Sequence, residues 1–90
     1  LGGGTVSGNT EKSGAGVYVK SKFVMKGGTV VNNTSTVSDY NIYAYRNSEV
    51  YLLKGTANGV IGGNGTIYFE RAFDFDGTYN LKSYGSFWRL

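Results

Sequence analysis

Three tyrosines recur at a constant interval of 25 residues, and they are the side chains of this sequence best suited to contact a ligand. They are Tyr18, Tyr43 and Tyr68. An outward row of aromatic rings on a rigid sheet can stack on sugar rings. The cations expected to flank this row would suit acidic glycans or lipopolysaccharide, and they are Lys20, Lys22, Arg46 and Arg71. The alternative is structural, because tyrosine is a good outward residue in strands and a cross-strand pair adds some stability.

Carboxylates cluster at one place in the sequence, where Glu70 precedes Asp74 and Asp76. The two aspartates alternate with Phe73 and Phe75, so they share one face of a strand and could bind a cation weakly through oxygen ligands. The stretch lacks the oxygen-rich spacing of an EF-hand loop. The alternative is an ordinary solvated strand face, and we predict neither a metal site nor a catalytic residue.

The composition removes several classes of chemistry. The sequence has no His and no Cys, so it has no disulfide framework, no common zinc ligands and no imidazole for proton transfer. The formal net charge is only +3, without the basic patch of a nucleic-acid binder. No apolar run reaches the roughly 18 residues of a membrane span. We expect no cofactor, no nucleic-acid partner and no membrane insertion by this segment.

A repeat indicates which elements position these residues. Gly-Gly-Thr-Val-Ser-Gly-Asn-Thr at residues 3–10 recurs as Gly-Gly-Thr-Val-Val-Asn-Asn-Thr at 27–34, with a weaker third copy at 60–64. Two further segments recur in the same order, at 16–19, 41–44 and 66–69, and at 23–27, 51–55 and 73–77. Short runs of alternating apolar residues predict strands, and the Gly, Asn, Ser and Thr between them predict turns. No window has the spacing of a helix.

Three strands in each repeat of about 24–28 residues predict an all-β fold, a parallel β-helix of about three coils with essentially no helix. Like residues recur because each one stacks on its counterpart one coil earlier. The 90 residues form one domain, with coils at about 3–26, 27–54 and 55–76. Residues 77–90 form a last partial coil or a cap.

Alternation along the strands separates an inner from an outer set of residues. The residues expected inside are Val6, Val17, Val19, Phe23, Met25, Val30, Ile42, Ala44, Ile61, Ile67, Phe69, Phe73 and Phe75. Around Tyr51 the best pattern places Val50 and Leu52 inside, which requires a slip of one residue against the repeat. Three asparagines fall at one corner, where turn formation is favoured over a ligand role: Asn9, Asn33 and Asn64.

The last dozen residues lose the repeat and accumulate large side chains. They are Tyr79, Leu81, Tyr84, Phe87 and Trp88. Terminal repeats of solenoids are atypical because they cover the core. We therefore expect residues 84–90 to pack over or finish the last coil, with Trp88 largely buried within the chain or against a neighbouring subunit.

The phrase Gly-Gly-Thr-Val-x-x-Asn-Thr, followed by Gly-Val-Tyr-Val and Phe-x-Met-x-Gly-Gly-Thr, resembles the repeat of bacterial adhesin-like β-helix proteins. These are similar to polymorphic outer-membrane protein and pectin-lyase-like solenoids. The resemblance covers residues 2–34 best and extends to about Gly77. It implies a right-handed parallel β-helix, export from the cell and a surface or adhesive role.

Two functions of different class follow. The first is a non-catalytic structural or adhesive segment of an extracellular or cell-surface bacterial protein, with neighbouring coils or subunits stacked end to end. The second is a carbohydrate-active or carbohydrate-binding β-helix module, such as a fragment of a polysaccharide lyase or a tailspike-like protein. The missing His and the sparse carboxylates favour the first. Glycans or a host surface are the further partners that either function implies.

Overall fold

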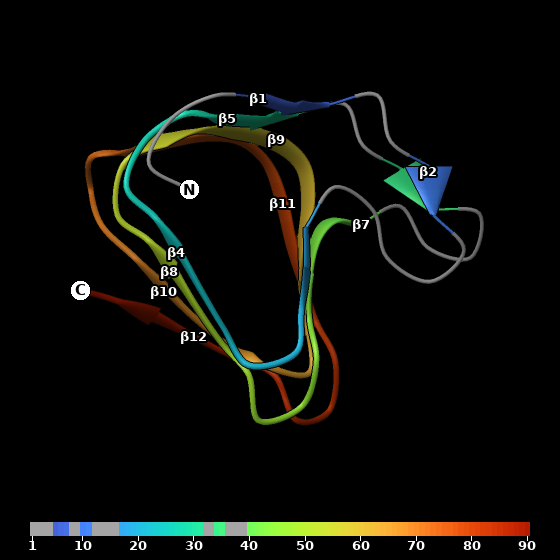
Figure 1. Ribbon diagram of the computed structural model, residues 1–90. Coiled ribbons are helices and arrows are strands. Elements are labelled where there is room, and N and C mark those ends of the chain that lie inside the picture. The colour runs from blue at the N-terminus through green and yellow to red at the C-terminus, as the bar shows by residue number, and fades with distance from the viewer. Residues whose placement is uncertain (1–4, 8–9, 12–16, 32–33, 36–39) are drawn as a thin grey trace.

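The protein consists of strands and turns wherever the structure describes it. The computed structural model describes residues 5–7, 10–11, 17–31, 34–35 and 40–90, and these residues contain no helix (Figure 1). The prediction of an all-β fold is confirmed for them. The strands are β1 (Thr5–Ser7), β2 (Thr10–Glu11), β3 (Val17–Val19), β4 (Lys22–Met25), β5 (Thr29–Val31), β6 (Thr34–Ser35), β7 (Tyr40–Ala44), β8 (Glu49–Leu52), β9 (Gly55–Gly63), β10 (Thr66–Phe69), β11 (Phe73–Leu81) and β12 (Ser86–Arg89).

The strands form curled sheets around a common interior. One sheet has the order β1-β5-β9-β7-β3, with β11 also paired to β9, and a second has the order β12-β10-β8-β4. The pair β2–β6 lies to one side of these two sheets (Figure 1). The pairings among the described strands are parallel, as predicted. No helix in the described part of the chain is long and apolar enough to cross a membrane.

The first two copies of the repeat are aligned as the sequence predicts. Thr5 lies opposite Thr29, which is 24 positions later. Val17 lies opposite Ile42, which is 25 positions later. Like residues of the first two copies therefore stack on each other in neighbouring strands of the same sheet.

The strands that hold the third copies, β10 and β11, are aligned differently from the prediction. Ile67 lies opposite Val50, 17 positions earlier, rather than opposite Ile42. Phe73 lies opposite Gly55, 18 positions earlier, rather than opposite a residue of β8. The interval between stacked residues thus falls from 24–27 positions in the first part of the chain to 17–20 in the second.

Strand β9 explains the shorter interval, because this one strand lies against two earlier ones. Its first part pairs with β5, where Ala57 lies opposite Val30, and its last part pairs with β7, where Ile61 lies opposite Ile42. Residues 32–39 separate β5 from β7 in the sequence, whereas the matching positions of β9 belong to one continuous strand. The predicted alignment of Ile61 with Val30 is therefore wrong, although both are buried.

Gly59 and Asn41 form the corner at which β9 passes from β5 to β7. Gly59 has a φ of 75°, which glycine adopts readily, and a Cβ on Gly77, its neighbour in β11, would meet the Gly59 carbonyl oxygen. Asn41 is the extra residue of a bulge in β7 and is fully buried. Its Nδ2 donates to the carbonyl oxygens of Val30 at 2.6 Å and Asn58 at 2.9 Å. The side chain thereby ties β5 to β9 at the corner.

Inward side chains from both curled sheets fill the interior. The fully buried apolar residues are Met25, Val30, Ile42, Ala44, Val50, Leu52, Ala57, Ile61 and Ile67. The predicted slip in β8 is confirmed, since Val50 and Leu52 are buried and Tyr51 between them is half-buried. Several other residues expected inside pack against this core with part of their surface exposed, namely Val17, Phe23, Phe69 and Phe75. The side chains of Val6, Asn9 and Asn33 lie outside the described residues.

The end of the chain extends the second sheet, because β12 pairs with β10 in parallel. Phe87 stacks on Phe69 with ring centroids 4.5 Å apart and also contacts Tyr79. Burial among these rings raises the pKa of Tyr79 to about 12. Burial of Trp88 within the chain is wrong, since 59% of it is exposed, whereas its burial against a neighbouring subunit stays a prediction. Alternation along β12 turns Phe87 toward the core and Trp88 away from it, in register with Tyr68.

Replacing Asn41 with alanine should lower the free energy of unfolding by about 3 kcal/mol, because two carbonyl oxygens at a buried corner lose their donor. Urea unfolding measures this change. Asn80→Ala serves as the control, since Asn80 is exposed on β11 and its loss should cost less than about 0.5 kcal/mol. Equal effects of the two substitutions would show that Asn41 does not hold the corner.

Candidate ligand-binding surface

The outward aromatic residues form two separate groups instead of the single predicted ladder. Tyr18 and Tyr43 lie opposite each other in the sheet that contains β3 and β7. Tyr68 lies in the other sheet, opposite Tyr51. The expected stacking is therefore confirmed for Tyr18 with Tyr43 and wrong for Tyr68. The reason is the shorter interval at β10, which aligns residues 66–69 with β8.

The first group, called the tyrosine cluster, consists of the half-buried Tyr18, Tyr43 and Tyr45 together with the buried Tyr40, whose ring meets that of Tyr43 edge-on. The rings of Tyr18 and Tyr43 are stacked, with centroids 5.6 Å apart and planes at 28°. Tyr45 meets both edge-on, at 4.3 Å and 5.7 Å. Tyr43 lies opposite Gly62 on its other side, so the column of tyrosines ends there.

Polar contacts hold the tyrosine cluster in place. The Nζ of Lys20 lies 6.0 Å from the ring centroid of Tyr18 and 5.5 Å from that of Tyr45, within the range of a cation–π attraction. Tyr40 is buried, and its hydroxyl donates to the carbonyl oxygen of Asn80 at 2.9 Å. Burial, and secondarily the neighbouring Tyr43, raise the pKa of Tyr40.

The second group, called the aromatic row, consists of Tyr51, Tyr68 and Trp88 on strands β8, β10 and β12. Tyr51 and Tyr68 are nearly parallel, with ring centroids 4.7 Å apart and planes at 13°. Trp88 follows in register beyond Tyr68 and is the most exposed member. The Nζ of Lys22 lies 5.2 Å from the ring centroid of Tyr51. The row therefore offers successive aromatic rings on one sheet face, with a cation at one end.

Glu49 sets the electrostatic surroundings of Tyr51. The Tyr51 hydroxyl donates to Oε2 of Glu49 at 3.1 Å. Burial, this hydrogen bond and the charges of Glu49 and Tyr68 together raise the pKa of Tyr51. The raised pKa favours the protonated hydroxyl, which is the form that donates to Glu49.

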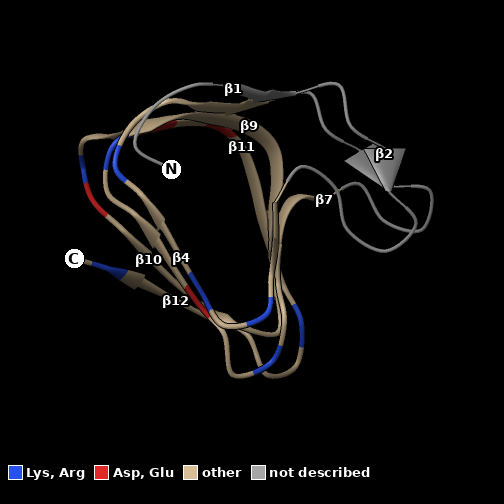
Figure 2. Cartoon of the chain, in the orientation of Figure 1, with Lys and Arg blue, Asp and Glu red and all other residues tan. Residues whose placement is uncertain are grey.

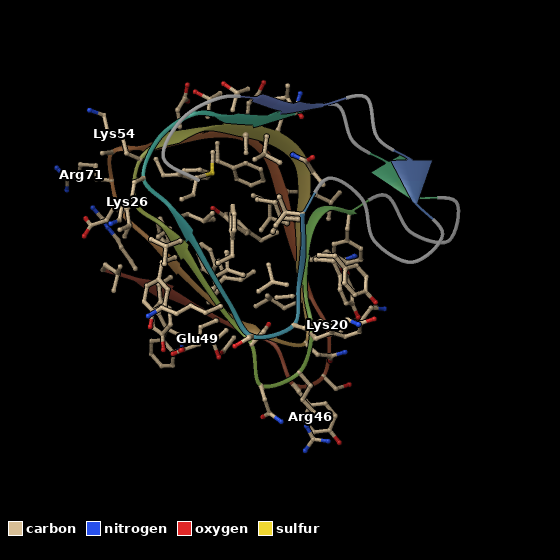
Figure 3. All side chains as sticks on the ribbon, viewed as in Figure 1. Lys20, Lys26, Arg46, Glu49, Lys54 and Arg71 are labelled. Carbon is tan, nitrogen blue, oxygen red and sulfur yellow. The ribbon has the colours of Figure 1, made fainter. Side chains whose placement is uncertain are left out.

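Several basic residues gather at the corners between the sheets, whereas Lys22 lies in β4 and Arg89 in β12 (Figure 2). Lys26, Lys54 and Arg71 project outward at one corner, beyond the ends of β4, β8 and β10 (Figure 3). Backbone hydrogen bonds join neighbouring segments at this corner. The amide of Lys54, for example, donates to the Met25 carbonyl. Of the cations predicted to flank the ladder, Lys20 does so, beside Tyr18, whereas Lys22 lies against Tyr51, which was not part of the predicted ladder. Arg71 instead belongs to this basic corner.

Arg46 contacts an aromatic ring that the sequence did not associate with it. Its guanidinium carbon lies 3.8 Å from the ring centroid of Tyr84, within the range of a cation–π contact. Tyr84 is 60% exposed. This pair lies at the corner shown with Arg46 in Figure 3 and is separate from the aromatic row.

The carboxylates proposed as a weak cation site are both exposed on β11. Asp74 lies opposite Thr56 and Asp76 opposite Asn58, so they share one face of the strand as predicted. In the described part of the chain, no group of three or more His, Cys, Asp or Glu side chains could hold a metal ion. Glu70 precedes the turn that leads into β11 and adds no third ligand to the pair.

Sequence reasoning missed Tyr51 and Trp88 as members of one row with Tyr68. The signal was present, because three segments share an apolar–aromatic alternation: Glu-Val-Tyr-Leu at 49–52, Thr-Ile-Tyr-Phe at 66–69 and Ser-Phe-Trp-Arg at 86–89. They are separated by 17 and 20 positions. A search with a variable interval would have aligned them.

Comparisons with known proteins identify no relative of this chain. No protein-family model, no curated protein and no solved structure matches the chain.

Proposed function

We propose that this chain is a segment of a right-handed parallel β-helix from a bacterial surface protein, and that it is non-catalytic and presents a rigid, repetitive surface. The observation that carries the proposal is the constant sidedness of stacked residues in the second sheet. The inward column is Phe23, Val50, Ile67 and Phe87, and the outward column is Val24, Tyr51, Tyr68 and Trp88. In such columns the same side of the sheet faces outward along the whole stack.

The β-helix part of the proposal is supported by three features together. The strand pairings are parallel, residues return to the same sheet at intervals of 17–27 positions, and one apolar core is shared by the sheets. Right-handedness follows from the strong preference of parallel crossover connections for that hand. The bacterial and extracellular parts rest on the likeness of the Gly-Gly-Thr-Val repeat to adhesin-like solenoids.

End-to-end stacking is the partner interaction that this architecture favours. Among the described strands, β12 lies at one end of the second sheet and pairs with β10 along one edge. An open strand edge is a template for a further parallel strand. A neighbouring coil or a second subunit is therefore the proposed occupant of the outer edge of β12.

The surface role predicts that antibodies raised against this chain label intact cells of the source bacterium. Fluorescence microscopy of unpermeabilised cells measures the labelling, and antibodies to a cytosolic protein serve as the control. Labelling that appears only after lysis would contradict the proposal.

Glycan binding is the second candidate function, and the exposure of Trp88 favours it. Trp88 continues the row of Tyr51 and Tyr68, so two or three sugar rings could stack along one sheet. Lys22 lies at one end of the row, and the basic corner of Lys26, Lys54 and Arg71 follows the same strands. This combination of rings and cations fits an acidic polysaccharide better than a neutral one.

The chain should therefore bind an acidic polysaccharide more tightly than its neutral counterpart, and Trp88→Ala should weaken binding about tenfold, or about 1.4 kcal/mol. Isothermal titration calorimetry measures both effects. Tyr84→Ala is the matched control, because Tyr84 is equally exposed but lies outside the row. Absence of binding, or equal losses in the two variants, would contradict this candidate.

A further inference from the structure

Tyr51 and Tyr68 stand out among the aromatic pairs because both are tyrosines and their rings are almost parallel. Their centroids are 4.7 Å apart with planes at 13°, compared with 5.6 Å and 28° for Tyr18 and Tyr43. The two residues lie directly opposite each other on β8 and β10. Both are half-buried, so the rings are held in contact yet remain accessible to a reagent in solution.

A proton acceptor is already in place beside this pair. The Tyr51 hydroxyl donates to Glu49 Oε2 at 3.1 Å. Among the tyrosine hydroxyls that the structure describes, this one donates to a carboxylate, whereas that of Tyr40 donates to a backbone carbonyl. Removing an electron from a phenol is easier when its proton can leave to a nearby base, so Tyr51 is the ring favoured for oxidation.

We propose that Tyr51 and Tyr68 form an oxidative cross-linking site, at which a one-electron oxidant of the haem peroxidase class joins the two rings as a dityrosine. The proposal rests on the ring geometry and on Glu49, and it is independent of the proposed surface role.

The reaction balances with hydrogen peroxide as the terminal oxidant. Each phenol loses one electron and its hydroxyl proton, and the Tyr51 proton leaves toward Glu49. The two radicals form a carbon–carbon bond between the ring positions next to each hydroxyl. Each ring then shifts its displaced hydrogen to oxygen and regains aromaticity. The pair loses two electrons and two protons in total, and these reduce one hydrogen peroxide to two waters.

The link would act as a covalent cross-link in a chain that has no disulfides. The sequence contains no Cys, so disulfides cannot brace its strands. A bond between Tyr51 and Tyr68 would close a loop across β8 and β10 and restrict the unfolded chain, as a disulfide does. The oxidised protein should therefore melt at a higher temperature than the untreated protein.

Treatment of the full chain with a haem peroxidase and hydrogen peroxide, at low protein concentration, tests the proposal. Trypsin separates the two residues into peptides 47–54 and 55–71, each of which contains one tyrosine. The expected product is a monomer that has lost two hydrogen atoms, shows dityrosine fluorescence and yields these two peptides joined. Peptide 13–20 carries Tyr18 and peptide 27–46 carries Tyr40, Tyr43 and Tyr45, and their joined form should be at least fivefold less abundant.

Variants distinguish this site from unspecific oxidation. Tyr68→Phe keeps the ring stack but should abolish the link and the gain in melting temperature, whereas Tyr84→Phe should leave both unchanged. Glu49→Gln should slow formation of the link several-fold without moving it, and an unchanged rate would overturn the part assigned to Glu49. Links that join mainly other tyrosines or separate molecules, or persistence of the product in Tyr68→Phe, would overturn the proposal.

Discussion

Parallel pairing around a shared interior is the constraint on which the rest of this structure depends. In a parallel ladder each residue stacks on a residue of the neighbouring strand and points to the same side. Once Val50 and Leu52 enter the core, Tyr51 must face outward, and the same rule then orients every residue of β10 and β12. The buried residues therefore determine which residues lie on the outer surface. The aromatic row follows from the positions that the apolar residues occupy along each strand.

The corner at Gly59 determines where that regularity changes. Because β9 continues through this corner, it covers both β5 and β7 and shortens the interval between stacked residues. Gly62 consequently lies opposite Tyr43 and ends the tyrosine cluster. The second sheet keeps its inward–outward alternation through four strands. The aromatic row therefore continues from strand to strand as far as the exposed Trp88. Asn41 holds the corner by supplying donors to two carbonyl oxygens.

Much of the first half of the fold could be predicted because the repeat there is nearly constant. The Gly-Gly-Thr-Val and Val-Tyr-Val segments recur at 24 and 25 positions, and the strands pair at those intervals. The second half could not be aligned by a constant interval. Thr-Ile-Tyr-Phe at 66–69 fits the pattern of β7 and that of β8 equally well, and the interval of 25 selected β7 wrongly. Which strand it joins depends on the path of β9, which short-range patterns do not encode. Trp88 was misplaced for a related reason, since its size suggested burial while the alternation with Phe87 places it outside.

The register of β11 on β9 tests this account most directly, and a chain without Cys permits a clean measurement. Thr56 and Asp74 are exposed neighbours in the two strands, with Cα atoms about 5 Å apart in a ladder of this kind. Spin labels on the double variant Thr56→Cys/Asp74→Cys should show strong dipolar broadening by electron paramagnetic resonance. Labels on Thr56→Cys/Leu81→Cys, a pair that a constant interval of 25 residues would place together, should show much weaker broadening. Strong broadening in the second pair and weak broadening in the first would contradict the register on which both outward aromatic groups depend.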